Sequence, residues 1–285
     1  PADRPGMRVR LKRFEKATTM HAQSFIIRRW SNLKEVRRTA LLWLLGASLL
    51  IGAGWFQIQA QQPLYSHEDA AEGGAYIEGV VGEVETLNPI FATKNAERGL
   101  SKLLFAGLLR VDERGAIAGD LAESWTVKES GKVYSVTLKP NLRWSDGEPI
   151  TTKDVVFTIN AIQSPESRSP LISAWDNVEV QAKNERTVEF SLRVPYAPFP
   201  ITLTTGILPE HNLSNIRPQQ LRNASFSTAP AVTSGPFTYR GTVDDRGNAR
   251  SLIDIYLLKN PAYHRGPAKL DRFTMRVYAD SDSLV

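Results

Sequence analysis

An uncharged apolar stretch near the N-terminus limits most strongly what this chain can form. Residues 39–66 carry no charged side chain, and their apolar core, residues 40–56, is 17 residues long. This core is longer than the ~7–15 apolar residues of a typical secretory signal and slightly shorter than the ~20 that a spanning helix prefers. The stretch predicts a transmembrane anchor or a cleaved signal sequence over residues 40–58, with a buried core helix as the third alternative.

Basic residues crowd one side of this stretch. Residues 1–39 hold 11 of the chain's 35 lysines and arginines but only three of its 30 acidic residues. Because positively charged flanks remain in the cytoplasm, this tail is predicted to be cytoplasmic, and the part after about residue 60 is predicted to lie outside. The expected location is therefore extracytoplasmic, anchored to the cytoplasmic membrane, with the basic tail contacting anionic lipids.

The remainder of the chain has the composition of an ordinary globular domain. It holds 24 basic and 27 acidic residues, so the positive charge of the whole chain comes from the tail. A slightly acidic domain argues against nucleic acid as a partner. The chain has no cysteine, which excludes disulfides, thiolate catalysis and a lipid attached to cysteine.

Local patterns after a Gln- and Pro-containing linker, residues 59–75, predict a mixed α/β lobe. A first strand is expected over residues 75–82. Leucines at helical spacing favour a helix over residues 96–109, and Thr151 with Asp154 forms a capping box that opens a helix over residues 151–162. Alternating segments around polar turns predict three hairpins, over residues 124–138, 178–192 and 237–258.

The sequence offers no catalytic constellation. None of the four histidines has a metal-ligand partner at helical spacing, and the chain contains no nucleophile elbow, phosphate loop or helical HExxH motif. Paired acids such as Glu83 with Glu85, or Asp244 with Asp245, are best interpreted as solvated carboxylates. We therefore predict no catalytic residue, no metal site and no cofactor.

Several motifs in order along the chain resemble one family. These are "LNPIF" after the first strand, "LAESW" with the following "LRWSDGEPITTKDV", and the later "SGPF" and "NPAYHRGP". Over residues 76–285 the chain resembles the family 5 extracellular solute-binding proteins, which are the oligopeptide-, dipeptide- and nickel-binding subunits of ATP-binding-cassette (ABC) importers. Considered without the resemblance, the residues of "LRWSDGEPITTKDV" predict a structural role, with a buried tryptophan, a tight turn at Gly147 and a helix cap.

The resemblance implies an α/β fold of the periplasmic-binding-protein type (type II, cluster C-like). Residues 76–275 would form its first lobe, a mixed sheet with hairpins and flanking helices preceded by one transmembrane helix. Residues 276–285 would begin a second lobe, which is truncated in this chain. Family members are much longer, and the residue that anchors a peptide's amino terminus would lie in that second lobe.

The resemblance also implies where a ligand binds. The segment Gly82, Glu83, Val84 and Glu85 would line the cleft between the lobes and pair with the backbone of an extended peptide, while Glu83 or Glu85 meets a cationic group. The alternative is that Asn88-Pro89 only turns the chain and the acids are solvated. A second candidate loop contains Thr204, Thr205 and Gly206, and its alternative interpretation is a helix end capped by Gly206.

The implied function is that of the substrate-binding component of an ABC transporter, delivering ligand to membrane permease subunits. Peptides, nickel chelates, sugars and other small solutes all occur as ligands in the family, so the resemblance leaves ligand identity open. The alternative function is a membrane-anchored extracytoplasmic interaction or sensory module without a transport role. A neighbouring permease gene would favour the first, and an isolated gene or a fused signalling domain the second.

Overall fold

The computed structural model describes residues 41–57, 72–245 and 252–279. The chain divides into two compact units, Pro1–Asp69 and Ala70–Val285. The described part of the first unit is a helix over residues 41–57. The predicted cytoplasmic tail, residues 1–39, lies outside the described residues, as do most of the predicted linker, residues 59–75, and the last six residues of the predicted start of a second lobe.

The membrane anchor predicted over residues 40–58 is not supported. Within the described ranges, no helix is both long enough and apolar enough to cross a membrane.

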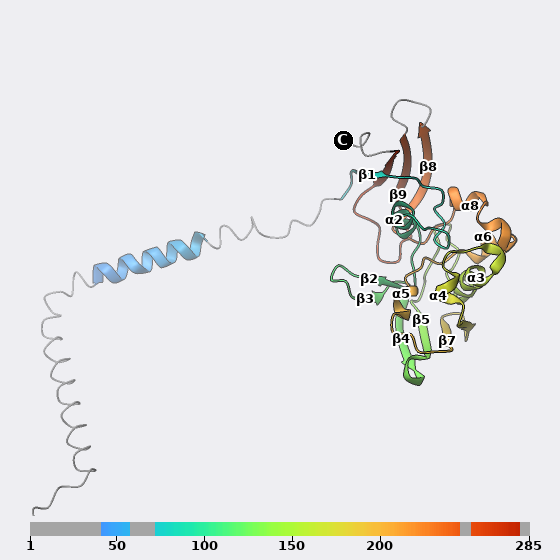
Figure 1. The fold of residues 1–285 in the computed structure, drawn as a ribbon. Helices are drawn as coiled ribbons and strands as arrows, with labels where there is room; N and C mark the ends of the chain where they lie inside the picture. Colours follow the sequence, from blue (N-terminus) through green and yellow to red (C-terminus); the bar gives the residue numbers. More distant parts are fainter. Residues whose placement is uncertain (1–40, 58–71, 246–251, 280–285) are drawn as a thin grey trace, which may run out of the picture. The chain divides into compact units, whose positions relative to one another are not determined.

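The second unit contains ten strands and several mostly short helices in its described part (Figure 1). The strands are β1 (Ala75–Val81), β2 (Leu109–Val111), β3 (Ile117–Gly119), β4 (Ala122–Lys128), β5 (Val133–Leu138), β6 (Val178–Ala182), β7 (Thr187–Leu192), β8 (Phe237–Asp245), β9 (Leu252–Lys259) and β10 (Arg272–Tyr278). The α-helices are α2 (Asn95–Leu104), α3 (Thr152–Gln163), α4 (Ile172–Trp175), α5 (Phe199–Thr202), α6 (Glu210–Leu213), α7 (Pro218–Leu221) and α8 (Ser225–Thr228), with 3-10 turns at Glu129–Gly131 and Pro165–Ser167.

The first and last strands of this unit pair with each other. Strands run in the order β1-β10-β9-β8, with β1 parallel to β10 from Ala75 opposite Arg272 to Val81 opposite Tyr278. The other two pairs are antiparallel, and β8 with β9 forms the predicted hairpin over residues 237–258. The sheet is therefore mixed, as the sequence predicted.

A second four-stranded sheet, ordered β4-β5-β7-β6, is antiparallel throughout. Alternate residues of β5 and β7 are buried, which is the period of a strand with one face on a core. Aromatic rings of Trp175, Phe190 and Phe199 lie about 6 Å from one another and fill that core. The hairpins predicted over residues 124–138 and 178–192 are both confirmed.

Helix α3 begins where the capping box predicted. The Thr151 hydroxyl accepts a hydrogen bond from the Lys153 N–H at 3.2 Å, and the Asp154 carboxylate accepts one from the Thr151 N–H at 2.8 Å. Asp154 also accepts the Glu210 N–H at 2.9 Å, which ties α3 to α6. The buried stripe of the helix includes Val155, Ile159 and Ile162.

The helix predicted over residues 96–109 ends earlier, at Leu104. Phe105 has extended backbone angles, and the next residue forms tertiary contacts. The Ala106 N–H donates to Ser234 Oγ at 3.0 Å, and its carbonyl accepts the Ile207 N–H at 3.1 Å. The leucine pattern extends beyond the end of the helix because Leu108 is also buried in the core, although it is not helical. The predicted helix was therefore too long.

The "SGPF" turn depends on a glycine. A Cβ at Gly235 would lie 2.4 Å from the carbonyl oxygen of Leu103, closer than any side chain tolerates. This close approach lets the Gly235 N–H donate to the Leu104 carbonyl at 2.8 Å, so the end of α2 is joined to the start of β8.

Replacing Thr151 by alanine should remove the α3 cap. We expect the free energy of unfolding, measured by chemical denaturation, to fall by about 1 kcal/mol. Lys153→Ala, exposed in the same helical turn, serves as the control and should change it by less than about 0.5 kcal/mol. Equal losses in the two variants would contradict the capping role.

Candidate functional site

The predicted cleft segment begins as a continuation of the β1–β10 pairing. Gly82 has a φ of +133°, a backbone conformation that favours glycine, and its N–H donates to the Tyr278 carbonyl at 2.9 Å. Beyond Gly82 the chain leaves the sheet and has no regular secondary structure up to residue 88. The segment is thus presented at the end of β1, beside the end of β10.

A buried carboxylate fixes the backbone of this segment. Glu97, in the first turn of α2, is 2% exposed and accepts three backbone N–H groups, from Glu85 at 3.0 Å, Thr93 at 2.9 Å and Lys94 at 3.0 Å. Burial raises the pKa of Glu97, but these donors and the nearby Lys94 ammonium outweigh it and hold the pKa below its usual value. Glu97 therefore positions Glu85 against the start of α2.

The two acids predicted to meet a ligand are held by a lysine. Lys94 Nζ lies 2.8 Å from a carboxylate oxygen of Glu83 and 2.8 Å from one of Glu85. The hydrogen bonds that Lys94 donates to these carboxylates raise its pKa well above its usual range. Both acids are largely exposed, at 77% and 69%, so they are surface carboxylates that share one counterion.

The next residues are joined to α8. Asn88, fully buried, donates from Nδ2 to Ser227 Oγ at 3.0 Å and accepts the Ile90 N–H on Oδ1 at 3.2 Å. The Leu87 N–H and the Thr86 hydroxyl both donate to the Ser227 carbonyl. Asn88 therefore both turns the chain and connects it to a distant segment.

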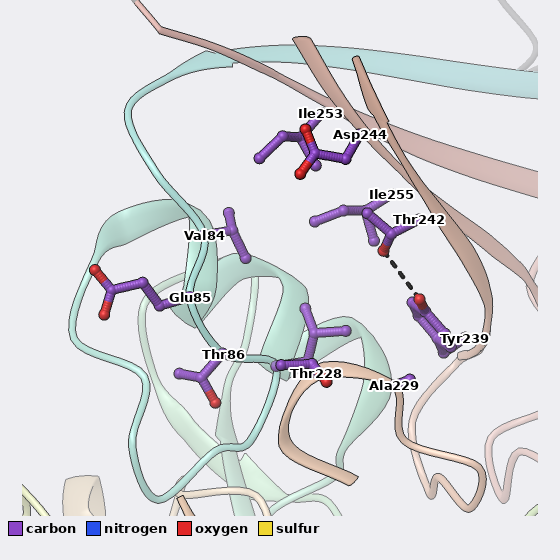
Figure 2. Close-up of a pocket in the computed structure, with 11 residues that line it drawn as sticks. Val84, Glu85, Thr86, Thr228, Ala229, Tyr239, Thr242, Asp244, Ile253 and Ile255 are labelled. Carbon is purple, nitrogen blue, oxygen red and sulfur yellow. Dashed lines mark hydrogen bonds between the residues drawn. The ribbon is translucent and has the colours of Figure 1, made fainter. Parts of the chain in front are cut away.

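A pocket of about 310 Å³ adjoins the segment (Figure 2). It is lined by Val84–Leu87, by Thr228 and Ala229, and by residues of the β8–β9 hairpin: Tyr239, Thr242, Asp244, Ile253 and Ile255. Figure 2 shows the Val84 side chain directed toward the hairpin and the Glu85 carboxylate directed away from the pocket. The segment thus presents an apolar side to the pocket and an acidic side away from it.

Val84 also has unused backbone groups. Backbone groups close to it on both sides are engaged, since the Gly82 N–H donates to the Tyr278 carbonyl and the Glu85 N–H donates to the Glu97 carboxylate. In the part of the chain that the structure describes, the N–H and C=O of Val84 have no hydrogen-bond partner. A partly exposed residue with both groups available is suited to pair with another extended backbone.

The second predicted loop lies elsewhere. The Thr204 and Thr205 hydroxyls donate to carbonyls of their own turn, those of Ile201 and Thr202. Gly206 is buried and forms a bridge with Gly107, and a Cβ there would lie 3.1 Å from the Pro89 Cβ. The loop therefore packs near the Asn88-Pro89 turn but does not line the pocket beside Val84.

Sequence reasoning missed Lys94, Glu97 and Ser227. Glu97 carried a usable signal, because an acid in the first turn of a helix is a common capping group. Lys94 carried a weaker one, because a cation at a helix N-terminus opposes the helix dipole and therefore indicates a nearby anion. Ser227 had none, since its partner lies 139 positions away.

Two of the four histidines lie within hydrogen-bond distance of aspartates in the second unit. His264 Nε2 is 3.0 Å from Asp120 Oδ1 in a nearly buried pair, and His211 Nε2 is 2.9 Å from Asp146 Oδ2 in a partly exposed one. His21 and His67 lie outside the described residues. Among the residues that are described, no group of three or more potential ligands is placed to hold a metal ion.

Replacing Glu97 by glutamine should free the segment from α2. An amide cannot accept all three N–H groups, so we expect the free energy of unfolding at pH 7 to fall by roughly 2–4 kcal/mol. Glu113→Gln, an exposed turn residue, is the matched control and should change it by less than about 0.5 kcal/mol.

The loss should depend on pH. Because the pKa of Glu97 in the folded state lies below its ordinary value of 4.5, its stabilisation is complete above that value and is lost as the pH falls through the lowered pKa. The stability difference between wild type and E97Q should therefore shrink below about pH 4.5. A difference that persists unchanged to pH 3 would contradict this role.

Comparison with known proteins identifies the family. The sequence model described as bacterial extracellular solute-binding proteins, family 5 Middle, matches residues 116–285. The oligopeptide-binding protein AppA of Bacillus subtilis is 28% identical over 217 residues, which cover 75% of this chain and 39% of AppA. The structure of AppA in complex with a nonapeptide matches with a TM-score of 0.69, covering 75% of this chain and 42% of that one.

Two further solved structures are similar. The ABC transporter substrate-binding protein CtaP from Listeria monocytogenes is 29% identical, with a TM-score of 0.64 over 75% of this chain and 42% of CtaP. NikZ from Campylobacter jejuni, in complex with Ni(L-His), is 26% identical, with a TM-score of 0.64 over 71% of this chain and 39% of NikZ. The periplasmic-binding-protein-like α/β fold predicted from the sequence is confirmed, and the chain spans about two fifths of the length of these relatives. The chain belongs to the bacterial extracellular solute-binding proteins, family 5.

Proposed function

We propose that this chain supplies one wall of a peptide-binding cleft in the substrate-binding component of an ABC importer. The observation that carries the proposal is the unused backbone of Val84, between the fixed residues Gly82 and Glu85. A ligand peptide would pair with Val84 as an added strand, which gives affinity with little dependence on peptide sequence.

A binding role fits the relatives better than catalysis. AppA is named for oligopeptide binding and was solved with a nonapeptide, while NikZ was solved with a nickel–histidine complex. We favour peptide because the candidate segment offers backbone groups, whereas a nickel complex needs coordinating side chains or a shaped polar cavity. Thr204, Thr205 and Gly206 act in this proposal as support for the turn at Asn88-Pro89, close to the cleft wall.

Delivery to a permease would follow from closure around the ligand. Binding proteins of two lobes close because the ligand contacts both lobes at once and stabilises the closed form. The chain covers about two fifths of its relatives, and residues 82–87 would form one side of such a cleft. Permease subunits would recognise the closed form, and the ligand would then be imported.

We further propose that residues 40–58 export the second unit, as an uncleaved anchor or a removed signal. The basic flank over residues 1–39 and the absence of charge over residues 39–66 support this orientation.

The backbone role of Val84 is testable with two variants. Val84→Ala keeps the peptide N–H and should bind an alanine pentapeptide within about threefold of wild type. Val84→Pro removes the N–H and should weaken binding about tenfold or more in calorimetry on the complete gene product. Equal affinities of the two variants, at equal thermal stability, would contradict backbone pairing.

Export is testable with a reporter. Alkaline phosphatase, which needs disulfides that form outside the cytoplasm, should be active when fused after residue 75. Replacing Leu44 and Leu45 by arginine should abolish the activity, because charge in the apolar core opposes insertion. Full activity of the arginine variant, or none with the native sequence, would refute the export role.

A further inference from the structure

Lys94 stands at a position that is unfavourable for a lysine. It is the N-cap residue of α2, where the helix dipole presents partial positive charge, and it makes no side-chain cap hydrogen bond. A serine, threonine or aspartate would suit the cap better. Helix stability therefore does not explain why a lysine occupies this N-cap position.

The geometry of the neighbouring segment supplies that explanation. Glu83 and Glu85 are two residues apart, and Lys94 Nζ lies 2.8 Å from each carboxylate. An ammonium has three donors, so one lysine can satisfy both acids at once. Glu97 holds the backbone of Glu85 and of Lys94 together, which keeps the three charged groups within reach of one another.

Stability alone does not account for the arrangement. The carboxylates of Glu83 and Glu85 are 77% and 69% exposed, and exposed ion pairs contribute little to stability because water and salt screen them. The two acids flank Val84, the residue whose backbone would meet the ligand. Because the Glu85 carboxylate is directed away from the pocket (Figure 2), the charge of the two acids acts on ligand side chains that lie on the acidic side of the segment.

We propose that Lys94 is a specificity-determining residue of the cleft: it neutralises Glu83 and Glu85, and so makes the site favour uncharged over cationic ligand groups on the acidic side of this segment. This inference rests on the proposed peptide-binding function. The ligand class that it names is neutral peptide segments. A cationic side chain at this point must compete with Lys94 for the two carboxylates.

The test compares affinities for matched peptides. The probes are alanine pentapeptides carrying one lysine or one glutamine at each position in turn, measured by calorimetry on the complete gene product. In Lys94→Met the lysine-to-glutamine affinity ratio should rise about 3- to 10-fold at a peptide position whose side chain lies on the acidic side of the segment. Lys102→Met, an exposed lysine in the last turn of α2, should leave the ratio unchanged.

A measurement without ligand distinguishes failure of the Lys94 specificity role from failure of the proposed peptide-binding function. NMR titration of the Lys94 side chain should give a pKa above the usual 10.5 in wild type and a value close to it in the double variant Glu83→Gln with Glu85→Gln. An unperturbed Lys94 pKa, or a ratio that K94M does not change although peptides bind, would overturn the specificity role alone. A raised Lys94 pKa with no peptide bound by any form would overturn the proposed function and this role with it.

Discussion

The parallel pairing of β1 with β10 is the constraint on which the rest of the second unit depends. It joins residues 75–81 to residues 272–278, so the eight described strands between them, and the helices, lie within one connection closed by this pairing. The candidate segment follows directly, because the Gly82 N–H bonds the Tyr278 carbonyl one step beyond the paired strands. Without this pairing, only the hydrogen bonds to Glu97 and Ser227 would hold the residues after β1 beside the β8–β9 hairpin.

The site combines a rigid backbone with adjustable charge. Glu97 and Ser227 hold the chain on either side of the Glu85–Leu87 stretch through buried hydrogen bonds, and such bonds are costly to break. The charged side chains beside it are exposed and can change partners at low cost. A ligand would therefore meet a preformed backbone surface, with selectivity set by groups that reorganise.

Local signals explain what the sequence predicted well. Helix α3 was found because Thr151 and Asp154 are three residues apart, and the hairpins because alternation flanks a polar turn. The end of α2 was missed because Ser234, 128 positions from Ala106, ends the helical run through a contact that no local pattern reveals. The family resemblance pointed to Glu83 and Glu85, but the lysine that holds them was hidden within an ordinary amphipathic helix pattern. The anchor rested on an uncharged apolar stretch beside a basic flank, and within the described residues no helix is long and apolar enough to cross a membrane.

The long sequence separation between β1 and its partner β10 also affects the order of folding during synthesis. Ribosomes add ~5–20 residues per second, so the roughly 200 residues between the two strands take about 10–40 s to synthesise. Throughout that interval β1 has no neighbour with which to form its sheet, although the hairpins that follow it can already fold. The segment proposed to meet the ligand, directly after β1, is thus made early in the synthesis of this unit, but its bond to β10 forms late.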